Sequence, residues 1–439
     1  MPVQTMNERV AVVVDGHSTG ALLAPAFTAY GIGSVHVENR AERSEAHLRT
    51  FAPETYVACY AYEGEGGWQE LLRALGRHRI GWVIAGTDSG VALADRLAAA
   101  LGVTRHNAPA TSAARRDKLA MQRALAAAGV PTAWHAAVTT AAEAEEVARR
   151  HGSGPVIVKP LRSGGTDGVV FCADPEEVAG AAGKLLGSES IYGERNDAVL
   201  VQEYLQGDEY MVNCVSAAGR HTVLEVWRSV KTVVGTSPVY DYTELVDPGS
   251  VPEITAYVGA SLSAVGIEWG PSHTEVICTP AGPRLVETAA RPQGTADLSA
   301  ITRATGRNPV AEVVHALLDP ELYARGGPPA PPPQRVARGV SFICPRGGRL
   351  RRDLDWSPLH TLPSFHSLLA PAPKAGEYIP RTTDLFTRPG AVYLIHPDAE
   401  VVARDHETIR RWEREGFYDI EEGDETEEGD EMEEGAPTT

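Results

Sequence analysis

The 439-residue chain has few aromatic residues, few cysteines and no long apolar run. Its five cysteines are scattered, and no pair has the spacing of a metal or redox motif, so we expect reduced thiols in a cytoplasmic protein. No stretch of about 18 apolar residues is available to span a membrane. The N-terminus MPVQTMNERV has no apolar region of the kind that marks a signal peptide. These absences argue against a disulfide scaffold, a secreted protein and a membrane partner.

Basic residues are also in the minority. The formal net charge is -18, and ten of the acidic residues lie between 421 and 434, so the rest of the chain carries -8. This balance is the reverse of that in nucleic-acid-binding proteins, and we expect no nucleic-acid partner. The acidic segment 421–439 is predicted to be disordered, because like charges repel and few apolar residues are present.

Strand and helix patterns alternate in the first quarter of the chain. Residues 9–14, 34–38 and 81–85 have the apolar composition of buried parallel strands, and helical patterns cover 21–30 and 68–79, among others. Such alternation predicts a doubly wound α/β domain over residues 1–110.

Strands outnumber helices beyond residue 110, so the middle of the chain has an α+β pattern, although residues 113–128 are predicted to form one helix. A proline-rich connector, GGPPAPPPQ, follows and is incompatible with a helix. We therefore expect four segments after the N-terminal domain. They are two regions at residues 111–200 and 201–325, a linker at 326–334 and a mainly β appendage at 335–420.

A lysine precedes a glycine-rich segment in the first of these middle regions. The sequence Val158-Lys159-Pro160 ends a strand, and RSGGTDGV follows it. Glycines let backbone N–H groups approach phosphate oxygens closely, and Lys159 supplies a point charge. The segment does not match a Walker loop. Taken alone, it is also compatible with an ordinary hairpin.

Two further segments carry acidic residues at the ends of strands. In QEYLQGDEY, the backbone after Glu203 could bind an adenine and Glu209 could accept hydrogen bonds from ribose, or the segment could be a surface hairpin. In GPSHTE and ETAAR, Glu275 and Glu287 could share a face and bind Mg²⁺ with nucleotide phosphates, with Arg291 close by. The alternative for this segment is a cross-strand polar pair with an arginine partner.

The order and spacing of these segments are similar to those of the ATP-grasp superfamily over residues 5–320. Lys118, in the sequence Arg116-Asp117-Lys118, matches the linker lysine of that superfamily, although by itself it would be a solvated residue at a helix start. The G-x-x-H-x-E and E-x-A-A-R segments most resemble the L-amino acid ligases, which join two amino acids into a dipeptide. The resemblance implies an α/β and α+β ATP-grasp fold with small (111–200) and large (201–325) subdomains.

The resemblance also implies the residues of an ATP and metal site. The residues that it implies for ATP are Lys118, Lys159, Ser163, Gly164, Gly165, Thr166, Gly168, Glu203, Tyr204, Leu205 and Glu209. Glu275 and Glu287 would bind Mg²⁺, or Mn²⁺ in its place. The residues implied for catalysis are Lys159, His273 and Arg291, although His273 could equally be structural. Ala289 departs from the Asn that many members carry, which weakens the assignment of a second metal ion.

Candidate substrate-binding residues lie at several turns. His17, Ser18 and Asp88 follow strands of the N-terminal domain, and Asp88 could bind a substrate ammonium or simply cap the next helix. Arg228 and Lys231 could hold a carboxylate or could be a solvated strand end. The remaining candidates, from the region that shapes the acyl pocket in the amino acid ligases, are His273, Arg291, Gly294 and Thr295.

We therefore expect an ATP-dependent carboxylate–amine ligase that works through an acyl phosphate and releases ADP and phosphate. Amino acids are the expected substrates, at least on one side. The alternatives are a carboxylating enzyme that uses bicarbonate and a non-catalytic nucleotide-binding partner protein. A homodimer is one expected form of the protein.

Overall fold

The computed structural model describes residues 9–42, 50–152, 154–165, 167–234, 237–329, 331–385 and 387–421. The chain divides into two compact units. Unit 1 comprises Met1–Val230 and Thr243–Ala337, and unit 2 comprises Lys231–Tyr242 and Arg338–Thr439. In the described part of the chain, no helix is both long and apolar enough to cross a bilayer.

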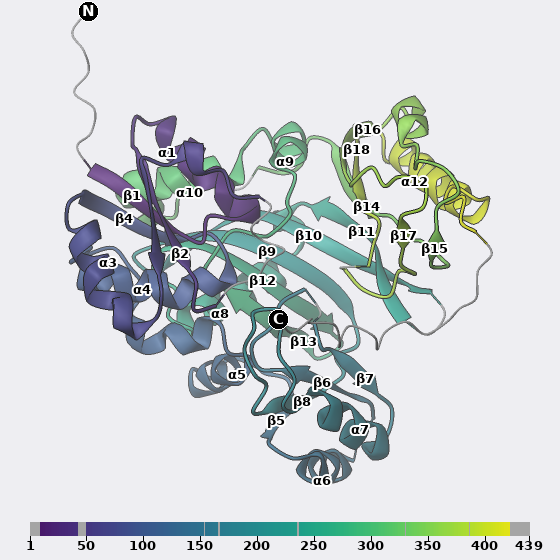
Figure 1. Cartoon of the computed structure of the whole chain (residues 1–439), viewed down its shortest axis with the longest axis horizontal. Coiled ribbons are helices and arrows are strands. Elements are labelled where there is room, and N and C mark those ends of the chain that lie inside the picture. Colours follow the sequence, from purple (N-terminus) through teal and green to yellow (C-terminus); the bar gives the residue numbers. More distant parts are fainter. Residues whose placement is uncertain are drawn as a thin grey trace, which may run out of the picture. The chain divides into compact units, whose positions relative to one another are not determined.

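The N-terminal part of unit 1 is built on a four-stranded parallel sheet in the order β3-β2-β1-β4 (Figure 1). The strands are β1 (Arg9–Val14), β2 (Ser34–Asn39), β3 (Ala58–Tyr62) and β4 (Arg79–Ala85). Alternate residues of β1 enter different cores: Val12 and Val14 pack with α3 (Trp68–Leu75) and α4 (Val91–Ala100), whereas Ala11 and Val13 pack with α1 (Leu23–Thr28). Both faces of the sheet are therefore covered, as parallel sheets require.

This strand order creates a crevice. The chain runs from β1 outward through β2 to β3 and then returns to the other side of β1 as β4. Ligands of open α/β sheets bind at such a switch point, outside the carboxyl ends of the strands. Gly20 and Gly86 come together there, and a Cβ atom added at Gly20 would lie 2.4 Å from the Gly86 Cα.

The small subdomain is an antiparallel sheet with two helices packed on it. Its strands are ordered β5-β8-β6-β7. They span β5 (His135–Val138), β6 (Val156–Pro160), β7 (Val170–Cys172) and β8 (Val199–Glu203). Helices α6 (Ala141–His151) and α7 (Pro175–Leu185) share an apolar core with these strands. The glycine-rich segment connects β6 to β7.

The large subdomain supplies four neighbouring antiparallel strands to unit 1, in the order β13-β12-β9-β10. They span β9 (Asp208–Ala217), β10 (Arg220–Val234), β12 (Gly270–Thr279) and β13 (Gly282–Ala289). Helix α8 (Pro252–Ala264) packs on one face with α5 (Lys118–Ala127), through Val212, Val226 and Val276 among others. Helices α9 (Leu298–Thr305), α10 (Pro309–Leu318) and α11 (Pro320–Ala324) follow β13.

Unit 2 combines strands with one long helix. It contains β15 (Gly348–Arg349), β16 (Phe365–Leu369), β17 (Tyr378–Ile379), β18 (Ala391–His396), most of β14 (Val336–Ser341), part of β11 (Ser237–Val246) and helix α12 (Ala399–Arg414). Within this unit, Arg410 and His406 of α12 bind Asp241 at 2.7 and 3.0 Å. The strands were expected for this region, whereas α12 was not.

Two of the predicted helices are wrong in their extent. The single helix expected over 113–128 is a 3-10 helix (Pro109–Arg115) followed by α5 from Lys118. Asp117 separates them because its side chain accepts a hydrogen bond from the Ala120 backbone N–H at 2.9 Å and so starts a new helix. Similarly, the helix expected over 21–30 begins as a 3-10 turn before α1.

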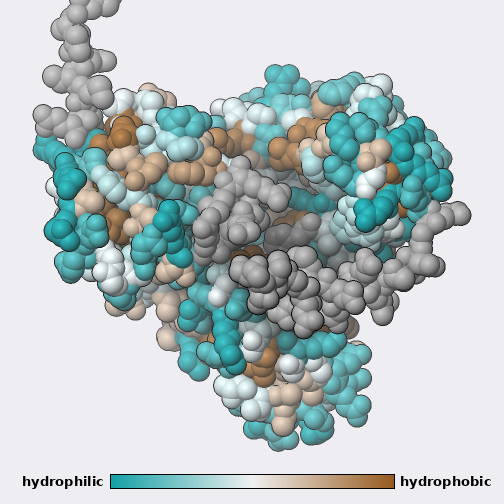
Figure 2. Space-filling view, in the orientation of Figure 1, coloured by the Kyte–Doolittle hydropathy of each residue, from teal (hydrophilic) through white to brown (hydrophobic). Residues whose placement is uncertain are grey.

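Some large hydrophobic side chains are exposed at the surface. On the face seen in Figure 2, brown and teal residues alternate over short distances. Large exposed hydrophobic side chains include Phe171 and Tyr204, whose rings meet edge to face at 5.1 Å between centroids. They lie on β7 and just after β8, next to the glycine-rich segment and the end of the strand that carries Glu203.

Candidate functional site

The central feature of the site is a pair of facing carboxylates. Glu275 of β12 lies directly opposite Glu287 of β13, and the register shifts by one residue immediately after this pair. His273, two residues before Glu275, lies on the same face because side chains alternate along a strand. Its Nε2 is 3.3 Å from Glu275 Oε1. Two carboxylates therefore face each other at the position expected for a metal, and a histidine lies beside one of them.

Lys118 connects this pair to the glycine-rich segment. Its Nζ lies 3.0 Å from Glu287 Oε2 and donates a hydrogen bond to the Ser163 carbonyl at 2.9 Å. Lys118 is the first residue of α5, directly after the capping Asp117. The start of the helix thus holds the ammonium group between a carboxylate and the loop backbone.

Lys159 of β6 joins the same cluster. The side chain is 2% exposed. Burial lowers the pKa of its ammonium group to about 7, the charge of Lys118 contributes in the same direction, and Glu287 and Glu275 oppose both. Two lysines beside two carboxylates form a site that suits phosphate groups together with a divalent cation, since hard cations take oxygen ligands.

Asp88 and Arg291 form an ion pair across the switch-point crevice. Arg291 donates to Asp88 Oδ2 from Nε at 2.8 Å and from NH2 at 2.7 Å. Burial favours the neutral form of Asp88, but the charge and hydrogen bonds of Arg291 outweigh this effect, so the pKa of the carboxyl lies below its ordinary value. Asp88 is not the cap of the next helix, since Thr87 occupies the N-cap position.

Two residues that the sequence analysis did not single out border this ion pair. The Tyr192 hydroxyl donates to Asp88 Oδ2 at 3.5 Å, and Arg116 NH1 donates to the Asp88 carbonyl at 2.8 Å. The Arg116 guanidinium also lies 5.2 Å from the centroid of the Tyr192 ring. Arg116 could have been suspected from its place beside Lys118, whereas Tyr192 has no local sequence signal.

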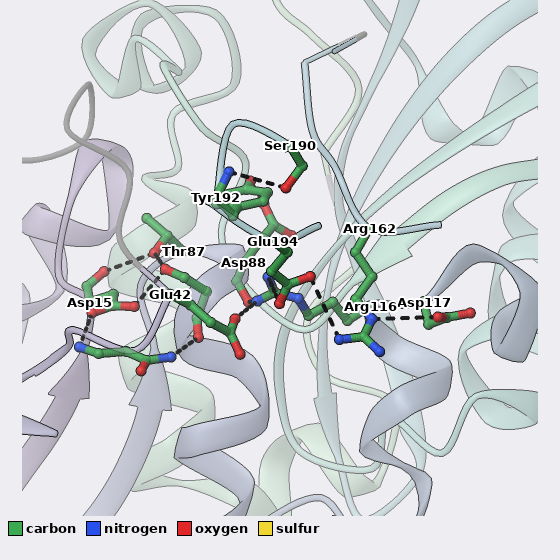
Figure 3. A network of polar contacts seen from close by, with 12 residues as sticks. Asp15, Glu42, Thr87, Asp88, Arg116, Asp117, Arg162, Ser190, Tyr192 and Glu194 are labelled. Carbon is green, nitrogen blue, oxygen red and sulfur yellow. Dashed lines mark hydrogen bonds and ion pairs between the residues drawn. The ribbon is translucent and has the colours of Figure 1, made fainter. Parts of the chain in front are cut away.

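Four ion pairs link the segments around Arg116 (Figure 3). Arg116 binds Glu42 at 2.6 Å and Glu194 at 3.5 Å. Arg162 binds Glu194 at 3.6 Å and Asp117 at 3.5 Å. We call these contacts the Glu194 network. It connects segment 188–197 to the N-terminal domain, to the start of α5 and to the glycine-rich segment.

These segments border a cavity whose empty space of about 320 Å³ includes volume that is open to solvent. The charged and hydroxyl-bearing residues that line it are Asp88, Arg115, Arg116, Lys118, Ser163, Tyr192, Glu287 and Thr288. We call this space the reaction cavity. Among the described residues, no group of three His, Cys, Asp or Glu side chains is arranged to hold a metal. An ion between Glu275 and Glu287 would therefore need oxygen ligands from a bound substrate such as a nucleotide.

The glycine-rich segment approaches the reaction cavity closely. Ser163 Oγ donates to the Asp167 carbonyl at 3.1 Å. A Cβ atom at Gly164 would lie 2.8 Å from the Tyr192 hydroxyl, and Gly165 and Gly168 have φ values of 64° and 66°. Side chains are disfavoured at these glycines, which leaves the backbone close to the cavity. Thr166 lies outside the described residues.

The segment expected to bind adenine and ribose joins the two subdomains. Glu203 ends β8, and its carboxylate accepts a hydrogen bond from the Trp134 N–H at 2.8 Å. The Tyr204 N–H donates to the Pro155 carbonyl at 3.0 Å. Leu205 is partly buried, and Glu209 lies on β9 on the same face as Met211, the partner of Glu275.

The first turn of the chain meets the stretch after Arg291. Ser18 Oγ accepts a hydrogen bond from the Thr295 N–H at 2.9 Å, and Gly294 lies beside the same hydroxyl. Ser18 and Thr295 both have φ of 51°, which is unfavourable for residues with a side chain. The structure thus brings these three predicted residues together. His17 is buried, 5.6 and 5.7 Å from the rings of His36 and Phe51.

Arg228 and Lys231 were expected to hold a second carboxylate. Arg228 lies 3.9 Å from Glu244, and among the described hydrogen bonds and ion pairs none joins it to the reaction cavity. Lys231 belongs to unit 2, where its ammonium group lies 4.7 Å from the centroid of the Tyr240 ring. These contacts do not assign either residue to a substrate.

Comparisons with known proteins agree on one family. The family model described as "Phosphoribosylglycinamide synthetase, ATP-grasp (A) domain" matches residues 116–237. The chain is 30% identical over 433 residues to "Dapdiamide A synthase" of Enterobacter agglomerans, which covers 94% of this chain and 97% of that protein.

Solved structures share the fold at lower sequence identity. The crystal structure of an L-amino acid ligase from Bacillus licheniformis matches with a TM-score of 0.71 at 17% identity, over 93% of this chain and 98% of that one. A phosphoribosylglycinamide synthetase from Anaerococcus prevotii matches with a TM-score of 0.60 at 14% identity, over 92% of this chain and 98% of that one.

Proposed function

We propose substrates and residue roles for this chain from the premise that it belongs to the ATP-grasp ligases. It is an enzyme that forms C–N bonds, making amides at the expense of ATP. The observation that carries the residue roles is that Lys118, Lys159, Glu275 and Glu287 form one cluster of charges, of which Lys118 and Glu287 line the reaction cavity. Arg291 is paired to Asp88, which also lines that cavity.

The proposed substrates are a carboxylic acid and an amine, with an amino acid on at least one side. The names of two similar proteins, a dapdiamide synthase and an L-amino acid ligase, support this choice. Use of bicarbonate is kept as a distinguishable outcome of the assay below. Location in the cytoplasm and a homodimer stay predictions.

In the proposed mechanism, Lys118 and Lys159 bind the phosphates of ATP, with help from the backbone of residues 163–168. A divalent cation held by Glu275 and Glu287 would neutralise charge on the phosphates as the phosphoryl group is transferred. An oxygen of the acid attacks the γ-phosphorus, the bond to ADP breaks, and an acyl phosphate results. Positioning and charge neutralisation suffice for this step, and no protein nucleophile is required.

The second step forms the amide. The amine nitrogen attacks the acyl carbon, the carbon–oxygen bond to phosphate breaks, and the nitrogen loses a proton. Arg291 would stabilise the negative charge that develops on the acyl oxygen. The Arg291 guanidinium donates to Asp88 from Nε and NH2. Its NH1 group does not contact Asp88 and donates to the Pro292 carbonyl at 3.1 Å. His273 lies beside Glu275, close enough to contact a bound acid.

We further propose that the backbone of Glu203–Leu205 binds adenine and that Glu209 binds ribose.

An acyl phosphate hydrolyses readily, so water must be excluded while it exists. Tyr192 and the Glu194 network would serve this purpose, because they fasten segment 188–197 over the reaction cavity.

The test is turnover by the purified protein with Mg·ATP and the twenty amino acids, singly and in pairs, with ADP, AMP and phosphate measured and products weighed by mass spectrometry. We expect ADP and phosphate, and a product at the summed mass minus water. Glu287→Gln and Arg291→Ala should abolish it. A product that gains only a carboxylate from bicarbonate would indicate carboxylation, and AMP with pyrophosphate would refute the acyl-phosphate route.

A further inference from the structure

A second cavity is lined in part by the residues that follow Arg291 in the chain. Its empty space of about 330 Å³ includes volume that is open to solvent. Its apolar wall includes Leu224, Leu298, Val310 and Val313. Its polar lining includes Asn213, Glu225 and Gln293. The ATP-grasp resemblance assigns no role to any of these three polar residues.

The polar residues form a row across three strands. Glu225 of β10 is the cross-strand partner of Asn213 on β9, and Asn213 is in turn the partner of His273 on β12. Asn213 Nδ2 donates to Glu225 Oε1 and to Gln293 Oε1, each at 2.7 Å, and Asn213 Oδ1 bonds His273 Nδ1 at 2.8 Å. Two hydrogen bonds, one between Asn213 and His273 and one between His273 and Glu275, therefore connect the cavity lining to Glu275.

Glu225 is, like Asp15, a deeply buried acidic residue of unit 1. Its side chain is 3% exposed, and among the described residues no Lys, Arg or His forms an ion pair with it. Burial raises the pKa of its carboxyl to about 7, and hydrogen bonds from Asn213 and Trp227 offset only part of this effect. Burying a carboxyl group without a cation is costly, so its retention beside a cavity points to a ligand that donates to it.

The position of the cavity indicates which ligand this is. Pro292 and Gln293 line it and directly follow Arg291, while Thr19, another lining residue, accepts a hydrogen bond from the Ala296 N–H at 3.2 Å. A substrate whose carboxylate lies at Arg291 would extend its other end in this direction. The apolar wall suits a carbon chain, and Glu225 suits N–H donors at the end of that chain.

We propose that this cavity receives the far end of the acid substrate, and that Glu225 selects a distal group that donates N–H hydrogen bonds over a hydrocarbon end of similar size. The donor is a carboxamide or an ammonium group. This inference rests on the proposed ligase function and specifies the acid that it uses.

The experiment separates acid recognition from amine recognition. Hydroxylamine replaces the amine, so that each acid is assayed by its own hydroxamate and by ADP release. The acids are glutamine, ornithine and norleucine, a longer set of homoglutamine, lysine and 2-aminoheptanoic acid, and glutamate. We expect kcat/KM for the carboxamide or ammonium acids to exceed that of the hydrocarbon acids by about tenfold or more, and glutamate to be rejected, because unpaired or like-charged buried groups disfavour the wrong ligand.

Two variants test the role of Glu225. Glu225→Leu should reduce the preference for N–H donors to less than about threefold. Glu225→Gln keeps the size and one acceptor oxygen, so it should retain a carboxamide preference and lose an ammonium preference; this difference identifies the donor. Glu321→Gln, on the exposed surface of α11, is the control for loss of one acidic charge and should leave all ratios unchanged. Thermal unfolding checks that each variant is folded.

The outcomes distinguish the two proposals. Equal use of all acids by the wild type, or an unchanged preference in folded Glu225→Leu, overturns the role of Glu225 and leaves the ligase function intact. If the enzyme turns over only acids outside this panel, the role of Glu225 is also overturned and the ligase function is left intact. Absence of ADP release with every acid tested, in this assay and with the twenty amino acids, refutes the proposed function and this inference with it.

Discussion

Among the described ion pairs, Arg291 has one carboxylate partner, Asp88, and Glu287 also contributes to its electrostatic environment. Burial would lower the pKa of the guanidinium, but Asp88 more than compensates, so the pKa is raised and Arg291 stays charged. A charge held in place before the reaction costs no reorganisation when the transition state forms. The residue therefore combines a structural ion pair with a proposed catalytic role.

We predict that Arg291→Lys lowers kcat by about 10²-fold or more, because an ammonium cannot donate to Asp88 from two nitrogens and face the substrate as well. The Kd for Mg·ATP should change by less than about threefold, because ATP is assigned to other residues. Steady-state kinetics and nucleotide binding measure the two effects. A variant with unchanged kcat would contradict the assigned role.

A second prediction at this scale concerns Asp15, which follows β1 and is 2% exposed. Burial raises the pKa of its carboxyl from 3.8 to about 6, despite hydrogen bonds from the Asn39 N–H and the Ser89 hydroxyl. Between these two pH values the native state binds more protons than the unfolded state. This group therefore makes the protein less stable as pH rises from about 4 to 6.

Asp15→Asn should remove that contribution. The free energy of unfolding of the variant, minus that of the wild type, should rise by on the order of 2 kcal/mol between about pH 4 and pH 6. Above that range the difference should be constant. Thermal midpoints of both proteins at pH 4 to 7 measure the difference. Asp353→Asn, at an exposed position, is the control. A wild-type minus variant difference that does not vary with pH would contradict the assignment.

At the scale of elements, the start of α5 carries Lys118 to its place. Asp117 caps this helix and also pairs with Arg162 at 3.5 Å. We predict that Asp117→Ala lowers the free energy of unfolding by about 1 kcal/mol and raises KM for ATP. Asp117→Asn retains a capping oxygen and should lose little stability. Equal effects of the two substitutions on stability would argue against capping.

Segment 188–197 is the second element that bears on the reaction. Glu194→Gln should weaken the Glu194 network and admit water to the reaction cavity, because both arginine contacts lose a charge partner. We expect more ADP released per amide formed, with a stability change below about 1 kcal/mol. Asp197→Asn, in an exposed ion pair of the same segment, is the matched control. If Glu194→Gln still released one ADP per amide formed, the network would not be needed to exclude water from the reaction cavity.

Elements with strong local patterns could be predicted from the sequence. The strands β1, β4, β6 and β12 lie close to their expected positions, because their apolar residues are continuous or alternate clearly. Strand β5 and helix α10 were not anticipated. The start of α5 was misplaced because the capping role of Asp117 depends on one side-chain hydrogen bond within a helical composition.

Some residues of the candidate site could likewise be predicted from the sequence, and others could not. Glu275 and Glu287 could be paired from their spacing alone, since the two strands are consecutive. Asn213 and Glu225 could not be identified, because a buried polar residue in a strand has no distinguishing sequence pattern. Asp88 was given two readings, a partner of a substrate ammonium and a helix cap. The cap reading is wrong because Thr87 holds the N-cap position. The contact of Asp88 with Arg291, 203 residues away, matches neither reading and has no signal in the sequence.

At the scale of the whole molecule, every residue assigned to ATP and the metal lies in unit 1. We predict that a non-hydrolysable ATP analogue with Mg²⁺ stabilises unit 1 by about 2.7 kcal/mol at 100 times its Kd. Unit 2 should gain no such stabilisation. Hydrogen exchange followed by peptide can report the two units separately. Glu287→Gln is the control, and equal protection of peptides from 390–414 would contradict the prediction.

The separation of Asp88 from Arg291 has a consequence for biosynthesis. At about 5–20 residues per second, roughly 10–40 s pass on the ribosome between the synthesis of the two residues. During this interval the nascent chain already contains Lys118 and Lys159 but lacks the guanidinium that we assign to amide formation. The metal ligands Glu275 and Glu287 are made only shortly before Arg291, so the site is completed within a few residues, and ligase activity should emerge only when nearly three hundred residues have left the ribosomal tunnel.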